Sequence, residues 1–254
     1  MELGGQSKKA SPLAWSHGAI ALARNETHDR VVDLLEKEAR GKVLDVPTGT
    51  GVLAGRLKGL GFAVSCCDIT SCYFSIPDLS IDRGDLNGSL PYPDDSFDYI
   101  TCLDGIEHTE NPFNALREFR RLLVRGGKLF LSVPNFLNIE RRVRYLFTGG
   151  LSKIPSHQTI EQVWDNDLSM VHLSPLPYPL LKFAMEHYGF RIVQLGKDRR
   201  KPRMIWLWPL AFVVRCFGLF ASNKRREAYR LKETLSKDVL MGGNTLIVVA
   251  ERMV

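Results

Sequence analysis

The 254-residue sequence lacks a C-x-x-C pair, an internal repeat and an uninterrupted apolar run of membrane-spanning length. Its five cysteines are an odd number, and three of them lie together around an expected strand; they are Cys66, Cys67, Cys72, Cys102 and Cys216. A structural metal site needs a second group of ligands near such thiols, and the sequence offers none at a suitable spacing. We therefore expect reduced thiols packed as small apolar side chains, and no metal site.

A signal peptide is also absent, because the N-terminal stretch MELGGQSKKASPLAWSHG has no apolar core. Residues 1–24 are expected to form a flexible leader, and the protein is expected in the cytoplasm. The remaining residues, 25–254, are enough for one domain with a proper core. An apolar content of 44% and a charged content of 24% are ordinary for a soluble globular protein.

The basic charge of the chain does not follow the pattern of a nucleic-acid-binding protein. The net charge is +6, and much of the excess falls in residues 141–144 and 197–232. Such a local excess favours an anionic surface or substrate. The basic residues flank an apolar run and are not interleaved with aromatic residues, so we do not expect nucleic acid as a partner.

Helical and strand patterns alternate along the chain. Apolar periodicity and glycine stops predict helices over residues 25–40 and 51–60, and a third from Pro112 to Gly126-Gly127 with Asn111 as its cap. Apolar runs predict strands over residues 42–46, 62–68, 99–103, 128–133, 190–195 and 245–250. This order indicates an α/β fold with a parallel sheet and crossover helices.

The stretch VLDVPTGTG, residues 43–51, joins the first expected strand to a helix. Ligands of open parallel sheets bind beyond the carboxyl ends of the strands. Gly49 and Gly51 let backbone N–H groups approach a ligand, and the following helix N-terminus adds further donors. Asp45 adds a carboxylate, which attracts an ammonium group and is a poor neighbour for phosphate. The loop therefore suits an amino-acid-like ligand better than a pyrophosphate.

Two further acidic residues follow expected strands. Asp68 ends the second strand, where its carboxylate can accept hydrogen bonds from both hydroxyls of a ribose, each worth roughly 1.5–3 kcal/mol. Asp85 follows the next short extended stretch, where it can accept a hydrogen bond from an adenine amino group while Leu86 packs beside the ring.

In order and spacing, VLDVPTGTG, CCDIT, GDLNGSLPYPDDSFDYITCLDGIEH and LREFRRLLVRGGKLFLSVPN resemble the motifs of class I S-adenosylmethionine-dependent methyltransferases of type 11/23. The resemblance covers about residues 25–135 and the strands GFRIVQL and NTLIVVAER. It implies a Rossmann-like α/β fold with a seven-stranded, mostly parallel sheet, an antiparallel last strand between its neighbours, and helices on both faces. Residues 25–254 would then form one methyltransferase domain.

The resemblance also implies S-adenosyl-L-methionine as the cofactor. Asp45 and the glycine loop would hold its methionine end, Asp68 its ribose, and Asp85 with Leu86 its adenine. The implied cofactor-binding positions are Asp45, Pro47, Gly49, Thr50, Gly51, Asp68, Asp85, Leu86 and Leu103. Pro47 departs from the family pattern, which has a glycine there, and proline removes one N–H donor from the loop.

Two other functions use the same residues. GTGVLA fits the G-x-G-x-x-A pattern of NAD(P)-dependent oxidoreductases. In that case Asp45 would face a pyrophosphate, and LPYPDDSFD would have no explanation. The other alternative is a non-catalytic scaffold or binding protein that keeps the cofactor fold, and Pro47 is the residue that favours it.

By the same resemblance, His108 in DGIEHTENP would lie near the sulfonium and act as the catalytic general base on a hydroxyl acceptor. The alternative is that His108 only packs or caps at a helix entry. Glu107 would pair with it or face water. His157 and His172 lie in residues 135–175, a segment long enough to cap the site, and both are expected to be structural.

Residues 197–243 form a second insertion, which separates the last two expected strands. Within it, the apolar run 204–221 is interrupted at Arg215 and flanked by DRRKPR and NKRREAYR. Two tryptophans and basic flanks favour a segment lying at the inner face of a membrane. A helix packed on the sheet, or a dimer contact, is the alternative. The predicted reaction is O-methylation of a small-molecule or lipid-linked acceptor, such as a polyprenyl-linked glycan or a quinone precursor, in a cell-surface glycan or lipid pathway.

Overall fold

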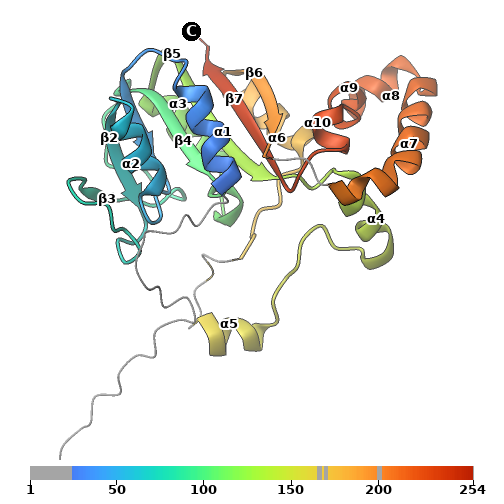
Figure 1. Ribbon diagram of the computed structural model, residues 1–254, viewed down its shortest axis with the longest axis horizontal. Coiled ribbons are helices and arrows are strands. Elements are labelled where there is room, and N and C mark those ends of the chain that lie inside the picture. Colours follow the sequence, from blue (N-terminus) through green and yellow to red (C-terminus); the bar gives the residue numbers. More distant parts are fainter. Residues whose placement is uncertain (1–24, 165–167, 169–170, 199–201, 254) are drawn as a thin grey trace, which may run out of the picture.

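The structure, a computed structural model, describes residues 25–164, 168, 171–198 and 202–253. These residues build one seven-stranded sheet with the strand order β3-β2-β1-β4-β5-β7-β6 (Figure 1). The strands are β1 (Lys42–Asp45), β2 (Ala63–Asp68), β3 (Ile81–Arg83), β4 (Phe97–Leu103), β5 (Leu123–Pro134), β6 (Phe190–Lys197) and β7 (Thr245–Arg252). Strand β7 runs antiparallel to both neighbours, β5 and β6, and the other pairs are parallel. The predicted fold class is confirmed; the predicted leader, residues 1–24, lies outside the described residues.

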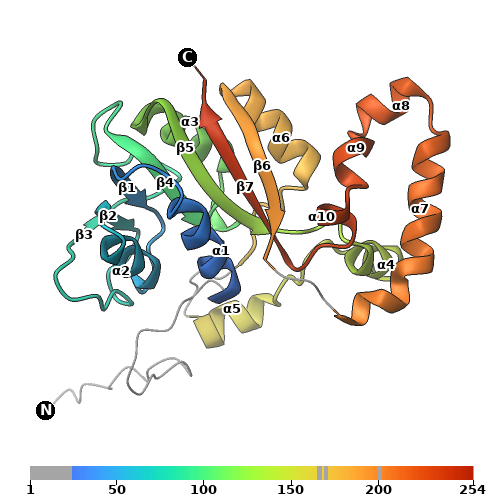
Figure 2. The same ribbon diagram turned by 45° about the horizontal axis from the view of Figure 1, so that its top comes forward.

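Helices cover both faces of the sheet, as Figures 1 and 2 show. Helices α1 (Asn25–Leu35) and α2 (Val52–Gly59) pack on one face, and α3 (Pro112–Leu122) and α6 (Tyr178–His187) pack on the other. Alternate residues of the central strands enter the two cores: Leu44 and Ile100 join α3 and α6, whereas Val43 and Tyr99 join α1 and α2. This alternation follows from the period-two geometry of a strand.

The cysteines are all free thiols. Cys66, Cys67 and Cys102 are buried in the core, as the sequence predicts, whereas Cys72 is exposed and Cys216 is half-buried. The expectation of packed thiols is therefore wrong for Cys72, which lies in the loop after β2, beyond the sheet that would bury it.

Two predicted boundaries are wrong. Helix α1 ends at Leu35 and not at residue 40, because the following hydrogen bonds change to three-residue spacing, from Lys37 N to Leu34 O and from Glu38 N to Leu35 O. Strand β5 begins at Leu123, where it pairs with Phe97, and α3 ends one residue earlier. The register shifts before Tyr99, so Gly126-Gly127 lie within an irregular strand and do not end the helix. Asn111 and Pro112 begin α3 as predicted.

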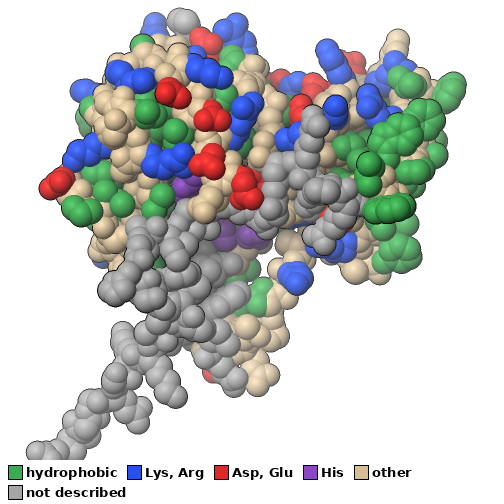
Figure 3. Space-filling model, viewed as in Figure 1, with side chains coloured by type: hydrophobic (Ala, Val, Ile, Leu, Met, Phe, Trp, Pro, Cys, Tyr) green, Lys and Arg blue, Asp and Glu red, His purple; other side chains and the backbone are tan. Residues whose placement is uncertain are grey.

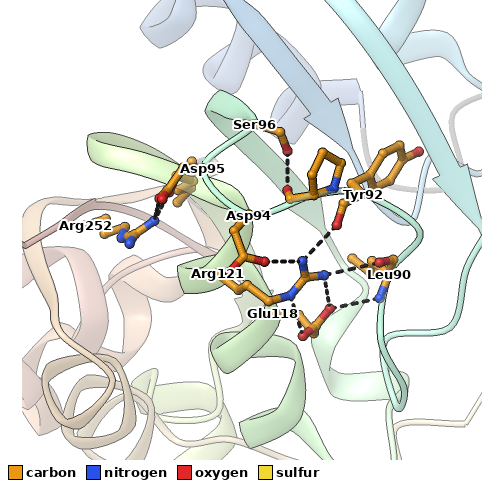
Figure 4. Close-up of polar contacts among 10 residues, drawn as sticks. Leu90, Tyr92, Asp94, Asp95, Ser96, Glu118, Arg121 and Arg252 are labelled. Atoms are coloured by element: carbon orange, nitrogen blue, oxygen red, sulfur yellow. Dashed lines mark hydrogen bonds and ion pairs between the residues drawn. The ribbon is translucent and has the colours of Figure 1, made fainter.

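The turn-rich stretch LPYPDDSFD is held against α3 by one guanidinium group (Figure 4). Arg121 donates to the carbonyl oxygens of Leu90 (3.2 Å) and Tyr92 (2.8 Å) and to Asp94 Oδ1 (2.8 Å). Its ion pair with Glu118 measures 2.7 Å, and Glu118 Oε2 also accepts from Leu90 N at 2.8 Å. The turn therefore positions β4 relative to α3, and with it the loop that follows Asp85.

Two insertions extend from the sheet. Between β5 and β6 lie α4 (Ile139–Thr148) and α5 (His157–Trp164). Between β6 and β7 lie the 3-10 helix η3 (Pro202–Leu207) and helices α7 (Trp208–Phe220), α8 (Asn223–Ala228), α9 (Leu231–Thr234) and α10 (Lys237–Leu240). The two insertions share a small core of Ile139, Met204, Ala211 and Leu240. In the part of the chain that the structure describes, no helix is both long and apolar enough to cross a membrane.

Candidate active site

A cavity of about 730 Å³ opens at the carboxyl ends of β1, β2 and β4. The structure brings nine of the ten predicted site residues to its wall: Asp45, Pro47, Gly49, Thr50, Asp68, Asp85, Leu86, Leu103 and His108. The tenth, Gly51, lies behind the wall as the N-cap of α2. Residues from strand ends, from the β1–α2 loop and from the 135–175 segment thus surround one volume.

Asp45 is the buried acid at the floor of the cavity, with only 2% of its surface exposed. Thr101 Oγ1 donates to its Oδ1 at 2.6 Å, and Thr48 Oγ1 donates to its Oδ2 at 2.9 Å. Burial raises the pKa of Asp45 to about 6, although both hydroxyl groups oppose the shift. The site therefore holds a desolvated carboxylate near neutral pH, and an ammonium group is the partner that would stabilise it.

The glycines of the β1–α2 loop adopt left-handed conformations, with φ of 55° at Gly49 and 81° at Gly51. A Cβ at Gly51 would lie 2.6 Å from the Phe74 ring, so this position needs glycine on two counts. Pro47 is accommodated by another glycine: a Cβ at Gly105 would lie 2.3 Å from Pro47 Cδ. The loop therefore keeps its turn despite Pro47.

Asp68 and Asp85 also line the cavity. Asp68 Oδ2 accepts from Gly49 N at 2.9 Å, and its Oδ1 accepts from Thr70 N at 3.2 Å, so this buried acid fixes the glycine loop as well as facing the cavity. Asp85 is exposed, and its Oδ1 accepts from both nitrogens of Asn87. Leu86 is buried beside it and supplies an apolar wall. Each carboxylate oxygen can accept a second hydrogen bond from a ligand.

His108 ends a 3-10 helix, η1 (Ile106–His108), and lies beside a second histidine. Its Nδ1 lies 3.0 Å from the carbonyl oxygen of Val171, and its ring is 4.9 Å from the ring of His172 at an angle of 81°. A carbonyl only accepts, so Nδ1 carries the proton and the neutral ring has its lone pair at Nε2. The backbone N–H of Ser174 also donates a hydrogen bond to this helix, to the carbonyl oxygen of Glu107 at 3.0 Å. The segment predicted as a cap is thus tied to η1.

The expectation that His172 is only structural misses its position on the cavity wall. Burial, followed by the neighbouring His108 and Arg141, lowers the pKa of His172, so the ring stays neutral over most of the physiological range. His157, by contrast, lies on α5 with 89% of its side chain exposed, 4.0 Å from Glu161. It does not line the cavity.

Glu107 lies on the cavity wall but is almost fully buried, and no ion pair of its carboxylate is found among the residues that the structure describes. It is 1% exposed, and its Oε2 has no hydrogen-bond partner within the described residues. Burial, reinforced by Asp104, raises its pKa well above the usual range. Potential ligand atoms of Glu107, His108 and His172 lie within 4.8 Å of one another, so these side chains have a spacing that a metal ion could use.

Several wall residues were not predicted as part of the site. Asp104 has a φ of 46° and exchanges hydrogen bonds with Ser132, from Asp104 N to Oγ at 2.8 Å and from Oγ to Asp104 Oδ1 at 2.6 Å. Glu140, Arg141 and Arg144 reach the wall from α4. The basic cluster at 141–144 was visible in the sequence, but nothing in one sequence indicates that α4 bends back over the strand ends.

The seven-stranded order and the strand-end cavity define a methyltransferase-type α/β fold. A family model described as "Methyltransferase domain" matches residues 20–195, and the chain therefore belongs to this methyltransferase family. The methyl donor that the family implies is S-adenosylmethionine, as the sequence predicts.

Curated relatives match a shorter part of the chain. A demethylmenaquinone methyltransferase of Paenarthrobacter aurescens is 32% identical over 107 residues, which are 40% of this chain and 42% of that protein. A ubiquinone biosynthesis O-methyltransferase of Xanthomonas euvesicatoria is 34% identical over 109 residues, 38% of this chain and 44% of that protein. The chain thus spans about two fifths of the length of these relatives.

Solved structures share the fold over most of the chain. A SAM-dependent methyltransferase from Archaeoglobus fulgidus superposes with a TM-score of 0.54 and 16% identity, covering 89% of this chain and 94% of that one. One from Mesorhizobium loti gives a TM-score of 0.51 and 14% identity, covering 89% and 98%. At these identities the likeness shows the fold.

The chemistry of the wall fits S-adenosylmethionine. Among the acids of the wall, the buried Asp45 suits an ammonium group, and Asp68 and Asp85 suit ribose hydroxyls and an amino group. Leu86 and Leu103 provide apolar surface for a flat ring.

Proposed function

We propose that the protein transfers a methyl group from S-adenosylmethionine to a hydroxyl oxygen of a small-molecule or lipid-linked acceptor. The observation that carries the proposal is the orientation of His108. Its Nδ1 is held by the Val171 carbonyl, so its basic nitrogen is Nε2, on a wall shared with Asp45 and Asp68.

In this proposal, Asp45 and the Gly49 loop hold the methionine end, Asp68 the ribose, and Asp85 with Leu86 the adenine. When bound, S-adenosylmethionine supplies a sulfonium methyl group, which passes to the acceptor oxygen as the C–S electron pair returns to sulfur. His108 Nε2 takes the hydroxyl proton of the acceptor. The neutral His172 beside it keeps a second positive charge away, which leaves His108 able to take up that proton.

The names of the curated relatives support an aromatic, quinone-type acceptor for this chain, and one of them is named as an O-methyltransferase. We therefore propose a hydroxylated ring as the first acceptor to test, and a polyprenyl-linked glycan as the second.

The first experiment is calorimetric titration of the full chain with S-adenosylmethionine, S-adenosylhomocysteine and NAD(P)H, with Asp68→Ala as the variant. The proposal expects the sulfonium compound and its product to bind and NAD(P)H not to bind. Loss of the ribose contact should weaken binding by about 10- to 150-fold. Asp33→Ala, at an exposed position on α1, is the matched control and should change nothing.

Acceptor turnover then tests His108. His108→Gln should lower kcat and remove the acidic limb of its pH profile, where protonation of the base reduces the rate, while leaving donor affinity unchanged. Donor binding without turnover on any hydroxylated acceptor would support the scaffold alternative, and a folded protein that binds no donor would show that Pro47 disables the loop.

A further inference from the structure

Helix α7 exposes large apolar side chains that the cofactor site does not use. Trp206 in η3 is 85% exposed, and Phe217 and Phe220 in α7 are 75% and 89% exposed. Smaller exposed fractions are found at Ile205, Trp208, Phe212, Val213 and Leu219. Figure 3 shows these hydrophobic side chains gathered at one edge of the molecule, over α7, with Lys and Arg side chains beside them. A patch of this kind on a protein surface marks an interaction site.

The outward orientation of this face is fixed by packing. Met204, Ala211 and Gly218 recur every seven residues and face the molecule, where they are buried. A Cβ at Gly218 would lie 2.1 Å from Leu235 Cδ1, so the helix approaches its neighbour as closely as a glycine allows. Within α7, the small residues Ala211 and Gly218 form the buried face, and the large residues lie outside. The exposed face is therefore a consequence of how α7 docks, and Pro209, the second residue of α7, begins the helix as a proline can.

Helix α4 extends this apolar surface toward the cavity. Its last turn exposes Tyr145, Leu146 and Phe147, and its first residue, Ile139, packs with Met204 and Ala211. Figures 1 and 2 both place α4 next to the start of α7. The same helix contributes Arg141 and Arg144 to the cavity wall. Helix α4 thus links the α7 insertion to the cavity wall and exposes further apolar side chains in its last turn.

The charged residues around the exposed face of α7 indicate which kind of partner binds it. Arg215 lies within α7, and Lys224, Arg225 and Arg226 begin α8 directly after it; all four are exposed. Glu227 is the single acidic residue from Met204 to Tyr229. A second copy of the chain would bring the same cations toward one another, whereas an anionic phospholipid surface complements them. Tryptophans with an apolar body and a polar N–H suit the boundary between acyl chains and headgroups.

We propose that α7 and the last turn of α4 form a docking surface for an anionic phospholipid bilayer. A helix of 13 residues is about 20 Å long, which is too short to cross a bilayer but long enough to lie in its interface. Because α4 also lines the cavity, docking through its last turn would bring the cavity close to the membrane surface, where an amphiphilic acceptor could present its polar group. The docking itself does not depend on the proposed methyl transfer.

The test is co-sedimentation of the full chain with vesicles of phosphatidylcholine alone and of phosphatidylcholine mixed with phosphatidylglycerol. We expect at least about tenfold stronger binding to the mixed vesicles, and a loss of at least about tenfold in the variant Trp206→Ser/Phe217→Ser/Phe220→Ser. The matched control changes exposed apolar residues on α6 and β6, Leu180→Ser/Phe183→Ser/Val193→Ser, and should bind like the parent. The charge variant Lys224→Glu/Arg225→Glu should lose the preference for phosphatidylglycerol, whereas Lys37→Glu/Arg125→Glu should keep it.

Three outcomes would overturn the proposal: no binding of the folded chain to mixed vesicles, binding that the triple serine variant retains, or a dimer in sedimentation velocity that depends on the patch while vesicles are not bound. Far-ultraviolet circular dichroism serves as the readout of folding in every variant. Calorimetric binding of S-adenosylmethionine is measured beside it and separates a failure of docking from a failure of the proposed enzyme function.

Discussion

The floor of the cavity and the outer face of α7 depart from the usual pattern of protein surfaces in opposite directions. The floor buries ionisable groups: Asp45 and Glu107 are almost fully removed from solvent, and burial raises the pKa of each. The face of α7 exposes aromatic rings, among them Phe217 and Phe220. In most domains these two kinds of residue are found the other way round.

The apolar core of the domain shows the placement of residues that folding alone requires. Helix α3 places Leu116, Phe119 and Leu122 against the sheet, and its one buried acid, Glu118, is paired with Arg121. A buried acid costs stability and an exposed ring contributes almost none, so neither region is explained by the fold's own energetics. We propose a binding partner for each region: a cationic ligand end for the first, and an apolar surface for the second.

The largest expected effect is in the ordinary core, and it sets the scale for the others. Phe119 is fully buried in the main core cluster. Phe119→Ala should lower the free energy of unfolding by about 3–5 kcal/mol, because the change removes buried apolar surface and leaves a cavity. Urea denaturation followed by circular dichroism measures it. A loss below about 1 kcal/mol would mean that the core around α3 is far looser than its burial indicates.

Asp45→Asn, unlike Phe119→Ala, should raise the free energy of unfolding. Burial raises the pKa of Asp45 from 3.8 to about 6, so the folded state prefers the protonated acid and its stabilising contribution is lost as pH rises through 6. The neutral variant should match the parent near about pH 4 and exceed its stability by up to about 3 kcal/mol near about pH 8. Donor binding should fall in the same variant.

The measurement for Asp45→Asn is a series of urea unfolding curves across that pH range, with calorimetry of S-adenosylmethionine beside it. A variant less stable than its parent at the higher pH would contradict the account, because the carboxylate would then be stabilised by groups other than Thr48 and Thr101.

His28 lines the same cavity and should give a smaller pH effect of opposite slope. Burial, followed by Arg56, lowers its pKa from 6.5 to about 4, so the unfolded chain binds a proton that the folded chain refuses, and stability is lost as pH falls below 6.5. The side chain of Arg56 is 38% exposed, so solvent screens its contribution to the lowered pKa of His28. We expect His28→Gln to recover about 2 kcal/mol near about pH 4 and nothing near about pH 8. If parent and variant lost the same stability at acidic pH, that loss would belong to groups other than His28.

Much of the fold was predictable because local patterns determined it. The alternation of apolar strands with glycine-ended helices gave the element order, and the resemblance supplied the antiparallel β7. What failed were ends of elements: α1 stops at Leu35 because its last turn tightens, and β5 reaches back to Leu123 through a register shift with β4. The first depends on the hydrogen-bond spacing of one turn and the second on pairing with another strand, and apolar periodicity encodes neither.

The candidate site divides in the same way. The residues on β1, β2, β4 and their loops were predictable, because the carboxyl ends of parallel strands meet at one edge. Those from the 135–175 segment were not. His172 and Arg141 reach the wall only because η1 binds Val171 and Ser174 and because α4 folds back beside η3. Gly105 was missed as well, since its role appears only when Pro47 lies against it.

The smallest expected effect on stability belongs to the face of α7. Phe217→Ser should change the free energy of unfolding by less than about 0.5 kcal/mol, because a side chain 75% exposed makes few contacts to lose. Urea denaturation of parent and variant without lipid, beside Phe119→Ala, measures the contrast directly. The same variant should resist aggregation better, since it removes part of an apolar patch. A loss above about 2 kcal/mol would mean that something already covers this ring in solution, and α7 would then belong to the core that the comparison sets it against.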